Sequence, residues 1–342
     1  MSICLPTMES EIEPQADIIR PTKRRRLFRA EFGVLLVVLV SFLALESIFR
    51  FRGEILSKDI AHLNSFDQIS RNLAEDAHPN ELRTLFLGNS LTRYGINQEL
   101  FTQIIEKDYH LSIKTAKMNP DNTALADWFY AYQTYYKKAG RPPEVMIVGF
   151  EGNHLRDAPS NHLDRLAYYY GAGNDPENLD RFDLKTLEQK ISFQLCRVSA
   201  AMANRDRLQR RMLDKVIPQY REGMDQLNGR LQIAGSSSRK EQISYERLLK
   251  FIALAEQDDV QVILVAMPVP EFYEFDTPLL EVVSSTSAQL VDCRLIPGLT
   301  NDMFFDGLHM DEQASRIYTT ALAEKIGLDL KLFQAEKIAQ FP

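Results

Sequence analysis

The stretch LRTLFLGNSL, residues 82–91, sets the fold of the chain. Its first seven residues are a short, mainly apolar run that ends at Gly88, and the turn residues Asn89 and Ser90 follow directly. Such a run is typical of a buried parallel strand. We therefore predict a strand that begins at Leu82 and delivers a polar loop at its carboxyl end.

Further apolar strands alternate with segments of helical periodicity on the carboxyl side of this stretch. Strands are predicted at 111–118, 144–150, 260–268 and 290–295, and helices at 97–107, 124–139, 245–257 and 312–326. This alternation indicates an α/β fold in which helices cover both faces of a parallel sheet, a three-layer α/β/α sandwich. Ligands bind at the carboxyl ends of the strands in such sheets, so residues that carry chemistry should follow strands.

One long segment interrupts the alternation. Residues 180–232 are highly charged and helical in spacing, and a Gly-Ser loop, Gly235–Ser238, follows them. We interpret about residues 175–240 as a helical insertion. Periodicity alone does not separate a solvated helical hairpin from a lid or a docking surface, so both remain open.

An uncharged apolar run, FGVLLVVLVSFLAL, occupies residues 32–45 near the N-terminus. With Ile48 and Phe49 it approaches the ~20 residues that a helix needs to cross ~30 Å of hydrocarbon. The alternatives are a cleaved signal peptide and a buried core helix. However, no small-residue cleavage site follows Leu45, and a core helix rarely carries a basic flank. The run therefore predicts one transmembrane signal anchor at 30–50.

The charges on either side of this span indicate its orientation. A tight basic cluster, Lys23–Arg26 with Arg29, precedes the span, while Arg50, Arg52 and Lys58 follow it. Because the more basic side stays in the cytoplasm, we expect a cytoplasmic N-terminus and an extracytoplasmic body. The predicted organisation is a cytoplasmic tail at 1–29, the anchor at 30–50, a linker or helical stem at 51–81 and the α/β domain at 82–335.

Composition excludes several classes of protein. Of the 342 residues 45% are hydrophobic, which is ordinary for a packed chain, and three cysteines are too few for a disulfide scaffold or a thiolate cluster. Residues 1–52 hold eight basic and six acidic side chains, a net charge of +2. Because the whole chain has a net charge of −7, the remaining residues have a net charge of −9. An acidic body argues against nucleic acid as a partner and favours a neutral or cationic acceptor.

Three polar clusters stand at predicted strand ends or just before the last helix: 88–91 (GNSL), 152–154 (GNH) and 306–309 (DGLH). A serine hydrolase needs a hydroxyl nucleophile, an imidazole base and a carboxylate that orients the imidazole. Ser90, His309 and Asp306 supply these groups, and the offset of three residues lets the carboxylate reach its neighbour's Nδ1. Donors for the oxyanion are expected from the backbone of Ser90 and from Gly152 and Asn153.

Each cluster has a plainer interpretation when it is taken alone. Gly-Asn-Ser is often only a turn, an asparagine such as Asn153 often caps a turn, and His309 would then be a surface histidine. The ordered occurrence of all three at strand ends favours catalysis. No metal-ligand spacing or phosphate-binding loop occurs, and we expect neither metal nor cofactor. The remaining histidines are interpreted as structural: His62, His78, His110 and His162.

The three clusters, in this order, resemble the blocks of the SGNH (GDSL-type) hydrolases. GNSL at 88–91 is similar to the G-D-S-L block, Gly152-Asn153 to the Gly-x-Asn-Asp block, and residues 306–309 to D-x-x-H, the most specific of the three. The resemblance covers roughly residues 82–326 apart from the insertion. It implies an SGNH or flavodoxin-like sheet, with Ser90 as nucleophile, His309 as base and Asp306 as its partner.

This sequence departs from the family pattern at several positions. Asn89 stands in place of aspartate, a change we expect to be tolerated because the role is structural. The glycine of the second block has no counterpart in 118–122, where Asp121 or Asn122 stands by position. Other departures lie beside the later blocks: Glu151, His154 and Met310.

The predicted topology resembles the SGNH branch with one membrane span. That branch includes the D-alanyl transfer protein of teichoic-acid modification and the acetyltransferases of alginate-type polysaccharides. The resemblance implies a serine esterase or O-acyltransferase that acts on acyl esters, expected to be acetyl, of extracytoplasmic glycans or envelope polymers. A membrane-bound O-acyltransferase is its expected partner. The alternative is a non-catalytic SGNH-like scaffold that docks a partner in such a system.

Aromatic side chains gather in the predicted helix at 124–139. Helical spacing places Trp128, Tyr132 and Tyr135 on one stripe. We interpret this stripe as a face that packs on the sheet, and a sugar-stacking platform is the alternative.

Overall fold

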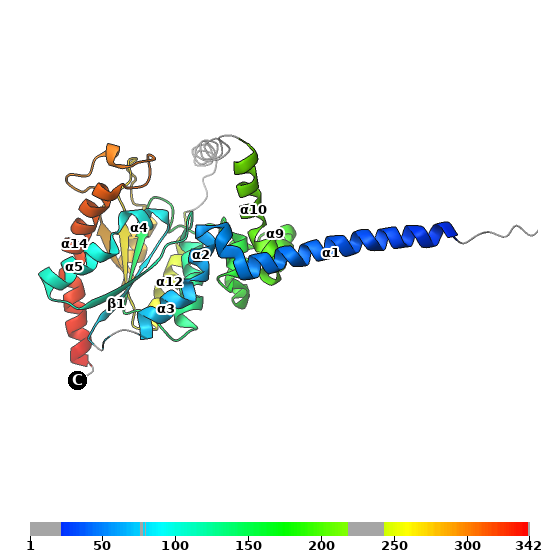
Figure 1. Ribbon diagram of the computed structural model, residues 1–342. Helices are drawn as coiled ribbons and strands as arrows, with labels where there is room; N and C mark the ends of the chain where they lie inside the picture. Colours follow the sequence, from blue (N-terminus) through cyan, green and yellow to red (C-terminus); the bar gives the residue numbers. More distant parts are fainter. Residues whose placement is uncertain (1–21, 76–77, 79, 218–242, 341–342) are drawn as a thin grey trace, which may run out of the picture. The chain divides into compact units, whose positions relative to one another are not determined.

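The computed structural model describes residues 22–75, 78, 80–217 and 243–340 (Figure 1). The chain forms two units, Met1–Ser47 and Ile48–Pro342. Part of the predicted insertion, including the loop Gly235–Ser238, falls outside the described residues.

The first unit contains most of a long helix, α1 (Thr22–Leu56). Within this helix Glu31–Ile55 is long and apolar enough to cross a membrane, and only 6% of its most apolar window is buried. A core helix of a soluble domain would bury its apolar side chains. The helical segment therefore agrees in length and exposure with a span, and it extends five residues beyond the predicted end at residue 50.

The second unit is built on a five-stranded sheet with strand order β2-β1-β3-β4-β5, and every pairing is parallel. This order reverses direction between β1 and β3, which is where doubly wound sheets bind ligands. The strands are β1 (Leu82–Leu87), β2 (Ile113–Met118), β3 (Val145–Phe150), β4 (Gln261–Ala266) and β5 (Gln289–Asp292).

Successive side chains on each strand point to opposite faces of the sheet and pack in two different hydrophobic clusters. On β1, Leu85 and Leu87 pack in one cluster with α3 (Phe66–Glu75), α6 (Leu125–Tyr132) and α12 (Glu246–Glu256). Phe86 packs in a second cluster with α5 (Gln98–Tyr109) and α14 (Glu312–Gln340). On β3, Met146 and Ile147 divide in the same way. Figure 1 shows α5 and α14 on one side of the strands and α3 and α12 on the other. The predicted three-layer α/β class is confirmed.

The helices of this unit are α2 (Lys58–Asn64), α3 (Phe66–Glu75), α4 (Ser90–Gly95), α5 (Gln98–Tyr109), α6 (Leu125–Tyr132), α7 (Leu163–Tyr168), α8 (Pro176–Asn178), α9 (Leu187–Val198), α10 (Ala200–Val216), α12 (Glu246–Glu256), α13 (Thr277–Ser284) and α14 (Glu312–Gln340). Short 3₁₀ segments occupy Ala172–Asn174 and Asn301–Met303. Two π-helical turns occupy Gln133–Lys137 and Leu179–Asp183.

The last helix differs most from its prediction, which ended it at Ile326. Helix α14 continues through Gly327 to Gln340. A Cβ at Gly327 would lie 2.4 Å from the ring of Tyr109 on α5. This glycine therefore permits close helix packing and does not end the helix, and Leu330 beyond it is fully buried.

The aromatic segment forms α6 and the π-turn that follows it. Trp128 and Tyr132 are fully buried and belong to the cluster that covers the sheet, and Tyr135 is partly buried against the same cluster. A buried stripe offers no face to a sugar. The aromatic stripe is part of the core, as the sequence predicts.

Candidate active site

The first candidate residue lies where β1 passes into α4. Asn89 is the N-cap of α4, and its Oδ1 accepts a hydrogen bond from the backbone N–H of Leu91 at 2.9 Å. Ser90 is therefore the first residue of α4 and stands at the carboxyl end of β1. A backbone N–H at this position has no acceptor within the helix, so that of Ser90 is available to a ligand.

Helix α4 lies directly against the ends of two strands. A Cβ at Gly88 would lie 2.1 Å from Oγ1 of Thr92, and a Cβ at Gly149 on β3 would lie 2.3 Å from the same atom. The hydroxyl of Thr92 donates to the carbonyl of Gly149 at 3.3 Å. The glycine of the GNSL block is thus required for close approach, because any larger residue would push α4 and its serine away.

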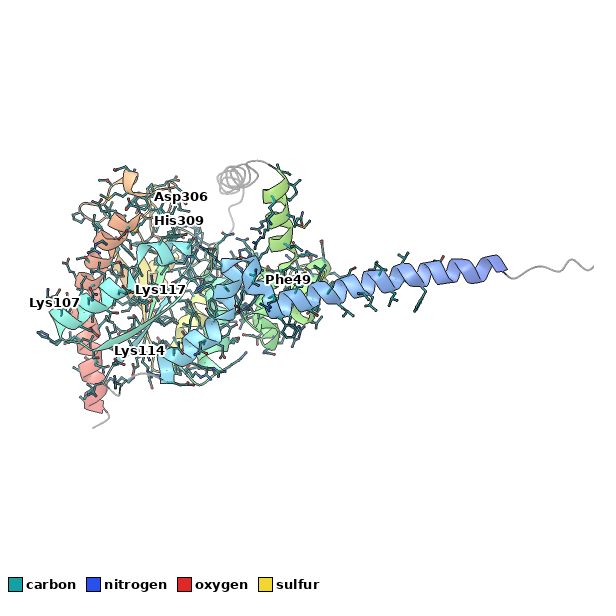
Figure 2. The ribbon with its side chains drawn as sticks, viewed as in Figure 1. Phe49, Lys107, Lys114, Lys117, Asp306 and His309 are labelled. Carbon is teal, nitrogen blue, oxygen red and sulfur yellow. The ribbon has the colours of Figure 1, made fainter. Side chains whose placement is uncertain are left out.

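Asp306 and His309 lie in the loop that precedes α14 (Figure 2). Oδ1 of Asp306 accepts the backbone N–H groups of Leu308 at 3.0 Å and of His309 at 2.7 Å, while Oδ2 lies 2.7 Å from Nδ1 of His309. Gly307 makes the turn with φ of +78°, which other residues rarely adopt. The carboxylate therefore holds both the loop and the imidazole.

The loop brings the imidazole to the serine. Nε2 of His309 lies 2.8 Å from Oγ of Ser90, although 219 positions separate them in the chain. With Nδ1–H donated to Asp306, Nε2 is the acceptor for the serine hydroxyl. Ser90, His309 and Asp306 thus form one continuous hydrogen-bonded chain, the arrangement of a serine hydrolase triad.

The charge of Asp306 is stabilised within this chain. Partial burial raises the pKa of its carboxyl, but the hydrogen bonds from His309 and Leu308 outweigh burial, so the pKa lies below the usual value. An ionised carboxylate beside Nδ1 stabilises the imidazolium that forms when the base takes a proton. The aromatic rings of Tyr94 and Phe305 flank His309, with centroids at 5.0 and 5.9 Å.

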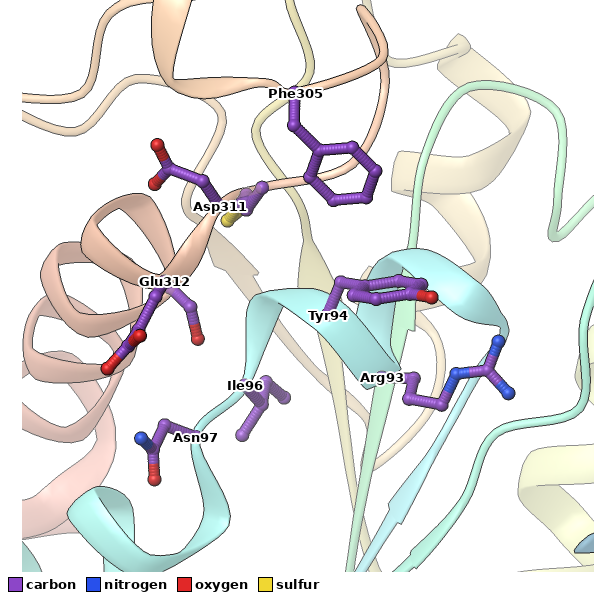
Figure 3. Close-up of a pocket in the computed structure, with 9 residues that line it drawn as sticks. Arg93, Tyr94, Ile96, Asn97, Phe305, Asp311 and Glu312 are labelled. Carbon is purple, nitrogen blue, oxygen red and sulfur yellow. The ribbon is translucent and has the colours of Figure 1, made fainter.

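Two cavities adjoin this site, and both are lined by Arg93 and Tyr94 of α4. The smaller, about 510 Å³, extends past Phe305 to the first turn of α14 (Figure 3). The larger, about 1120 Å³, is strongly charged and runs to residues 54–59 and to the arginines of α10. Neither lining includes Ser90 or His309, so the triad stands beside these cavities rather than in them.

The expected oxyanion donors Gly152 and Asn153 have no hydrogen bond to Ser90 among the described residues, and only their neighbour His154 contacts the turn that carries it. Gly152 and Asn153 follow β3, and the next residue, His154, lies 3.4 Å from the side-chain nitrogen of Asn89. The loop therefore reaches the serine turn. Asn153 itself is exposed, and its side chain makes no hydrogen bond to the triad within the described part of the chain.

The segment after β2 is where the sequence has no counterpart for the second-block glycine. In the structure this segment makes a charged contact with α4. Asp121 forms an ion pair with Arg93, three residues after Ser90 on α4. Asn122 has φ of +53°, and its carbonyl lies 2.9 Å from Nε2 of His162. Neither Asp121 nor Asn122 makes a side-chain contact with Ser90 within the described ranges.

Three histidines position these loops. His62 accepts the backbone N–H of Asn119 at 3.1 Å, and burial lowers the pKa of its imidazole. Burial also lowers the pKa of His154 to about 4 and that of His162 to about 3, so all three are neutral near pH 7. His62 and His162 thus contact the segment after β2 at two points, Asn119 and Asn122.

Arg93, Tyr94 and Lys117 were not identified from the sequence. Nζ of Lys117 on β2 donates to the backbone carbonyl of Ile96 and lies 3.4 Å from that of Arg93, and burial lowers its pKa to about 8. Lys117 therefore ties the end of α4 to the sheet. Arg93 could have been identified from its position three residues after Ser90, because this spacing places both side chains on one face of a helix.

No group of three or more His, Cys, Asp or Glu side chains is placed to hold a metal ion among the residues that the structure describes.

No protein-family model and no curated protein matches the chain. Among solved structures, the chain is similar to Axe2, an acetylxylan esterase from Geobacillus stearothermophilus, with 12% identity, a TM-score of 0.36 and coverage of 71% of this chain and 93% of that one. It is also similar to LAE5, an alpha/beta hydrolase from the metagenome of Lake Arreo, Spain, with 11% identity, a TM-score of 0.35 and coverage of 73% and 96%. At these values neither similarity establishes a family.

Proposed function

We propose that the chain is a membrane-anchored serine esterase or O-acyltransferase of the SGNH type. One observation carries the proposal: Oγ of Ser90 lies 2.8 Å from Nε2 of His309, whose Nδ1 lies 2.7 Å from Asp306, at the carboxyl end of β1. If Ser90 were only a turn residue and His309 only a surface histidine, a hydrogen bond between them would not be expected, because they are 219 positions apart in the sequence.

The reaction begins with attack of the Ser90 oxygen on the acyl carbonyl carbon while Nε2 of His309 takes the hydroxyl proton. The resulting oxyanion is held by the backbone N–H of Ser90, with Asn153 and Gly152 as the further candidates. The imidazolium then gives its proton to the leaving alcohol, which departs and leaves an acyl ester on Ser90. Water or a sugar hydroxyl, deprotonated by His309, then attacks the acyl carbon; the bond to the Ser90 oxygen breaks, and that oxygen takes the proton back from His309.

The acceptor is proposed to be a glycan or another polymer of the cell envelope. The larger cavity, about 1120 Å³, exceeds the usual volume of a small-ligand pocket and is lined mainly by charged and polar side chains. Such a cleft suits a hydroxyl-rich polymer, and an acetyl group is the proposed acyl unit. A membrane-bound O-acyltransferase would supply it, and α1 would hold the protein at the membrane with its N-terminus in the cytoplasm.

The catalytic part of the proposal is tested with 4-nitrophenyl acetate and a fluorophosphonate. The full-length protein in detergent should hydrolyse the ester and carry the label on Ser90, and Ser90→Ala should lose both. Ser284→Ala is the matched control, since this serine is exposed and its hydroxyl bonds only within its own helix. Equal turnover by wild type and Ser90→Ala would contradict the proposal that the protein is a serine enzyme and would favour the alternative of a non-catalytic scaffold.

Transfer is separated from hydrolysis by the product. An acetyl donor and a neutral oligosaccharide are incubated with the protein, and mass spectrometry follows both products. Acetylated oligosaccharide that is absent with Ser90→Ala supports the transferase, whereas free acetate alone supports the esterase. Protease protection in sealed membrane vesicles tests the orientation, because only the tail before α1 should be cleaved from the cytoplasmic side.

A further inference from the structure

Helix α9 of the insertion has two apolar faces. Phe193 and Cys196 on one face are buried in the domain. On the opposite face Leu187, Ile191, Leu195 and Val198 are 73%, 54%, 46% and 69% exposed. Their spacing of four, four and three residues forms one continuous stripe along the helix, which we call the α9 stripe. A solvated hairpin would carry polar residues there.

Helix α10 continues this surface with positive charge. It contains five basic residues against two acidic ones, and Met212 and Val216 are exposed near its end. Four of the basic residues are exposed, Arg205, Arg210, Arg211 and Lys215, whereas Arg207 is largely buried in ion pairs with Asp59 and Asp164. The surface is therefore basic and apolar, although the body of the chain is acidic on average. This combination is typical of helices that bind anionic lipid surfaces.

Both helices are tied to the carboxyl end of α1. Phe49 (Figure 2) packs with Ala200 and Ala201, and Arg50 donates to the carbonyl of Val198 at 3.4 Å. Arg211 of α10 donates to the carbonyl of Ile55 at 3.1 Å. These contacts lie within the second unit, but residues 49–55 also end the segment that is apolar enough to span a membrane.

We propose that the α9 stripe lies in the interface of the lipid bilayer and that the exposed cations of α10 contact anionic headgroups. Chain connectivity supports the bilayer as occupant, because the residues that hold Val198 in place are those that would leave the membrane. The charge of α10 supports it independently. The inference rests on the proposed membrane attachment of α1.

Docking of the α9 stripe would also orient the site. Arg207 and Arg211 of α10 and Asp59 of α2 line the larger cavity, and Arg207 pairs with Asp59 at 3.3 Å. With α9 held in the interface, this cavity opens close to the membrane surface. A lipid-linked or membrane-delivered donor would then reach the triad without leaving the surface.

The test uses tryptophan quenching by brominated lipids in the full-length protein, reconstituted in phosphatidylcholine vesicles with or without phosphatidylglycerol. Trp128 is the one native tryptophan and is fully buried, so wild type gives the baseline. Ile191→Trp reports on the α9 stripe, and Leu195→Trp repeats the measurement at a second position. Val37→Trp reports on α1, and Leu328→Trp, exposed on α14, is the matched control.

The proposal predicts strong quenching of Val37→Trp and of both stripe variants, while Leu328→Trp stays at the baseline. Quenching of the stripe should increase with phosphatidylglycerol, and no increase would overturn the role of the α10 cations. Quenching of Val37→Trp alone would overturn docking and leave the anchor intact, with the stripe free for a protein. No quenching of Val37→Trp would instead overturn the membrane attachment itself.

Discussion

The loops of the candidate active site, residues 88–90 and 304–310, and the α9–α10 insertion are held by different interactions. The loops depend on a few directed hydrogen bonds at 2.7–2.9 Å, above all those of Asp306; residues 88 and 89 are buried, whereas residues 305–308 are exposed. The insertion depends on burial of one apolar face and on ion pairs such as Arg207–Asp164 at 2.9 Å, and leaves its other face open. The structure of the loops therefore depends on a few individual hydrogen-bonding groups, whereas that of the insertion depends on burial of a whole helix face.

This contrast predicts the largest effect for His309→Ala. Removal of the base should lower kcat for a small acetyl ester by about 10⁵–10⁶-fold, and combination with Ser90→Ala should lower it no further, because triad residues act as a unit. The free energy of unfolding should change little. Steady-state kinetics measure the effect, with the exposed His78→Ala as control. Additive losses in the double variant would contradict a shared triad.

Asp306→Asn should have the next largest effect. Asparagine can still accept the backbone N–H groups of Leu308 and His309, so the loop should keep its shape, while Nδ1 of His309 loses its carboxylate. A decrease in kcat of about 10⁴-fold is expected from the loss of charge and tautomer control. A decrease below tenfold, with unchanged loop structure in a crystal, would show that the catalytic role of His309 does not depend on the Asp306 carboxylate.

Substitutions in the insertion should have the opposite effect: they should change the free energy of unfolding and leave kcat unchanged. Phe193→Ala on the buried face of α9 should cost about 3–5 kcal/mol of unfolding free energy. Ile191→Gln on the α9 stripe should change it by about 0.5 kcal/mol or less in detergent. Urea unfolding followed by Trp128 fluorescence compares the two. Equal losses would mean that the α9 stripe is covered within the protein.

The same contrast explains what the sequence could predict. The strand patterns identified the sheet, and the GNSL and DGLH clusters identified Ser90, Asp306 and His309, which the structure brings together. The GNH cluster reaches this place through His154 and not through the predicted Asn153. The continuation of α14 past Gly327 was missed because a glycine after a helical run predicts the end of the helix, whereas here it makes room for the ring of Tyr109, a residue more than 200 positions away. The pair Arg93–Asp121 was missed because its two residues lie on different elements, 28 positions apart. The open α9 stripe was not predicted, because periodicity does not show which apolar face is covered.

The smallest expected effect separates helix capping from positioning of the nucleophile. Asn89 caps α4 and Asn97 caps α5, with Oδ1 accepting a backbone N–H at 2.9 and 3.0 Å. Either substitution by alanine should cost about 1 kcal/mol of stability. Only Asn89→Ala should also lower kcat, because α4 carries Ser90 and Nδ2 of Asn89 holds the carbonyl of Thr123 at 3.2 Å. Equal kcat in the two variants would show that the cap stabilises the turn without setting the position of the serine.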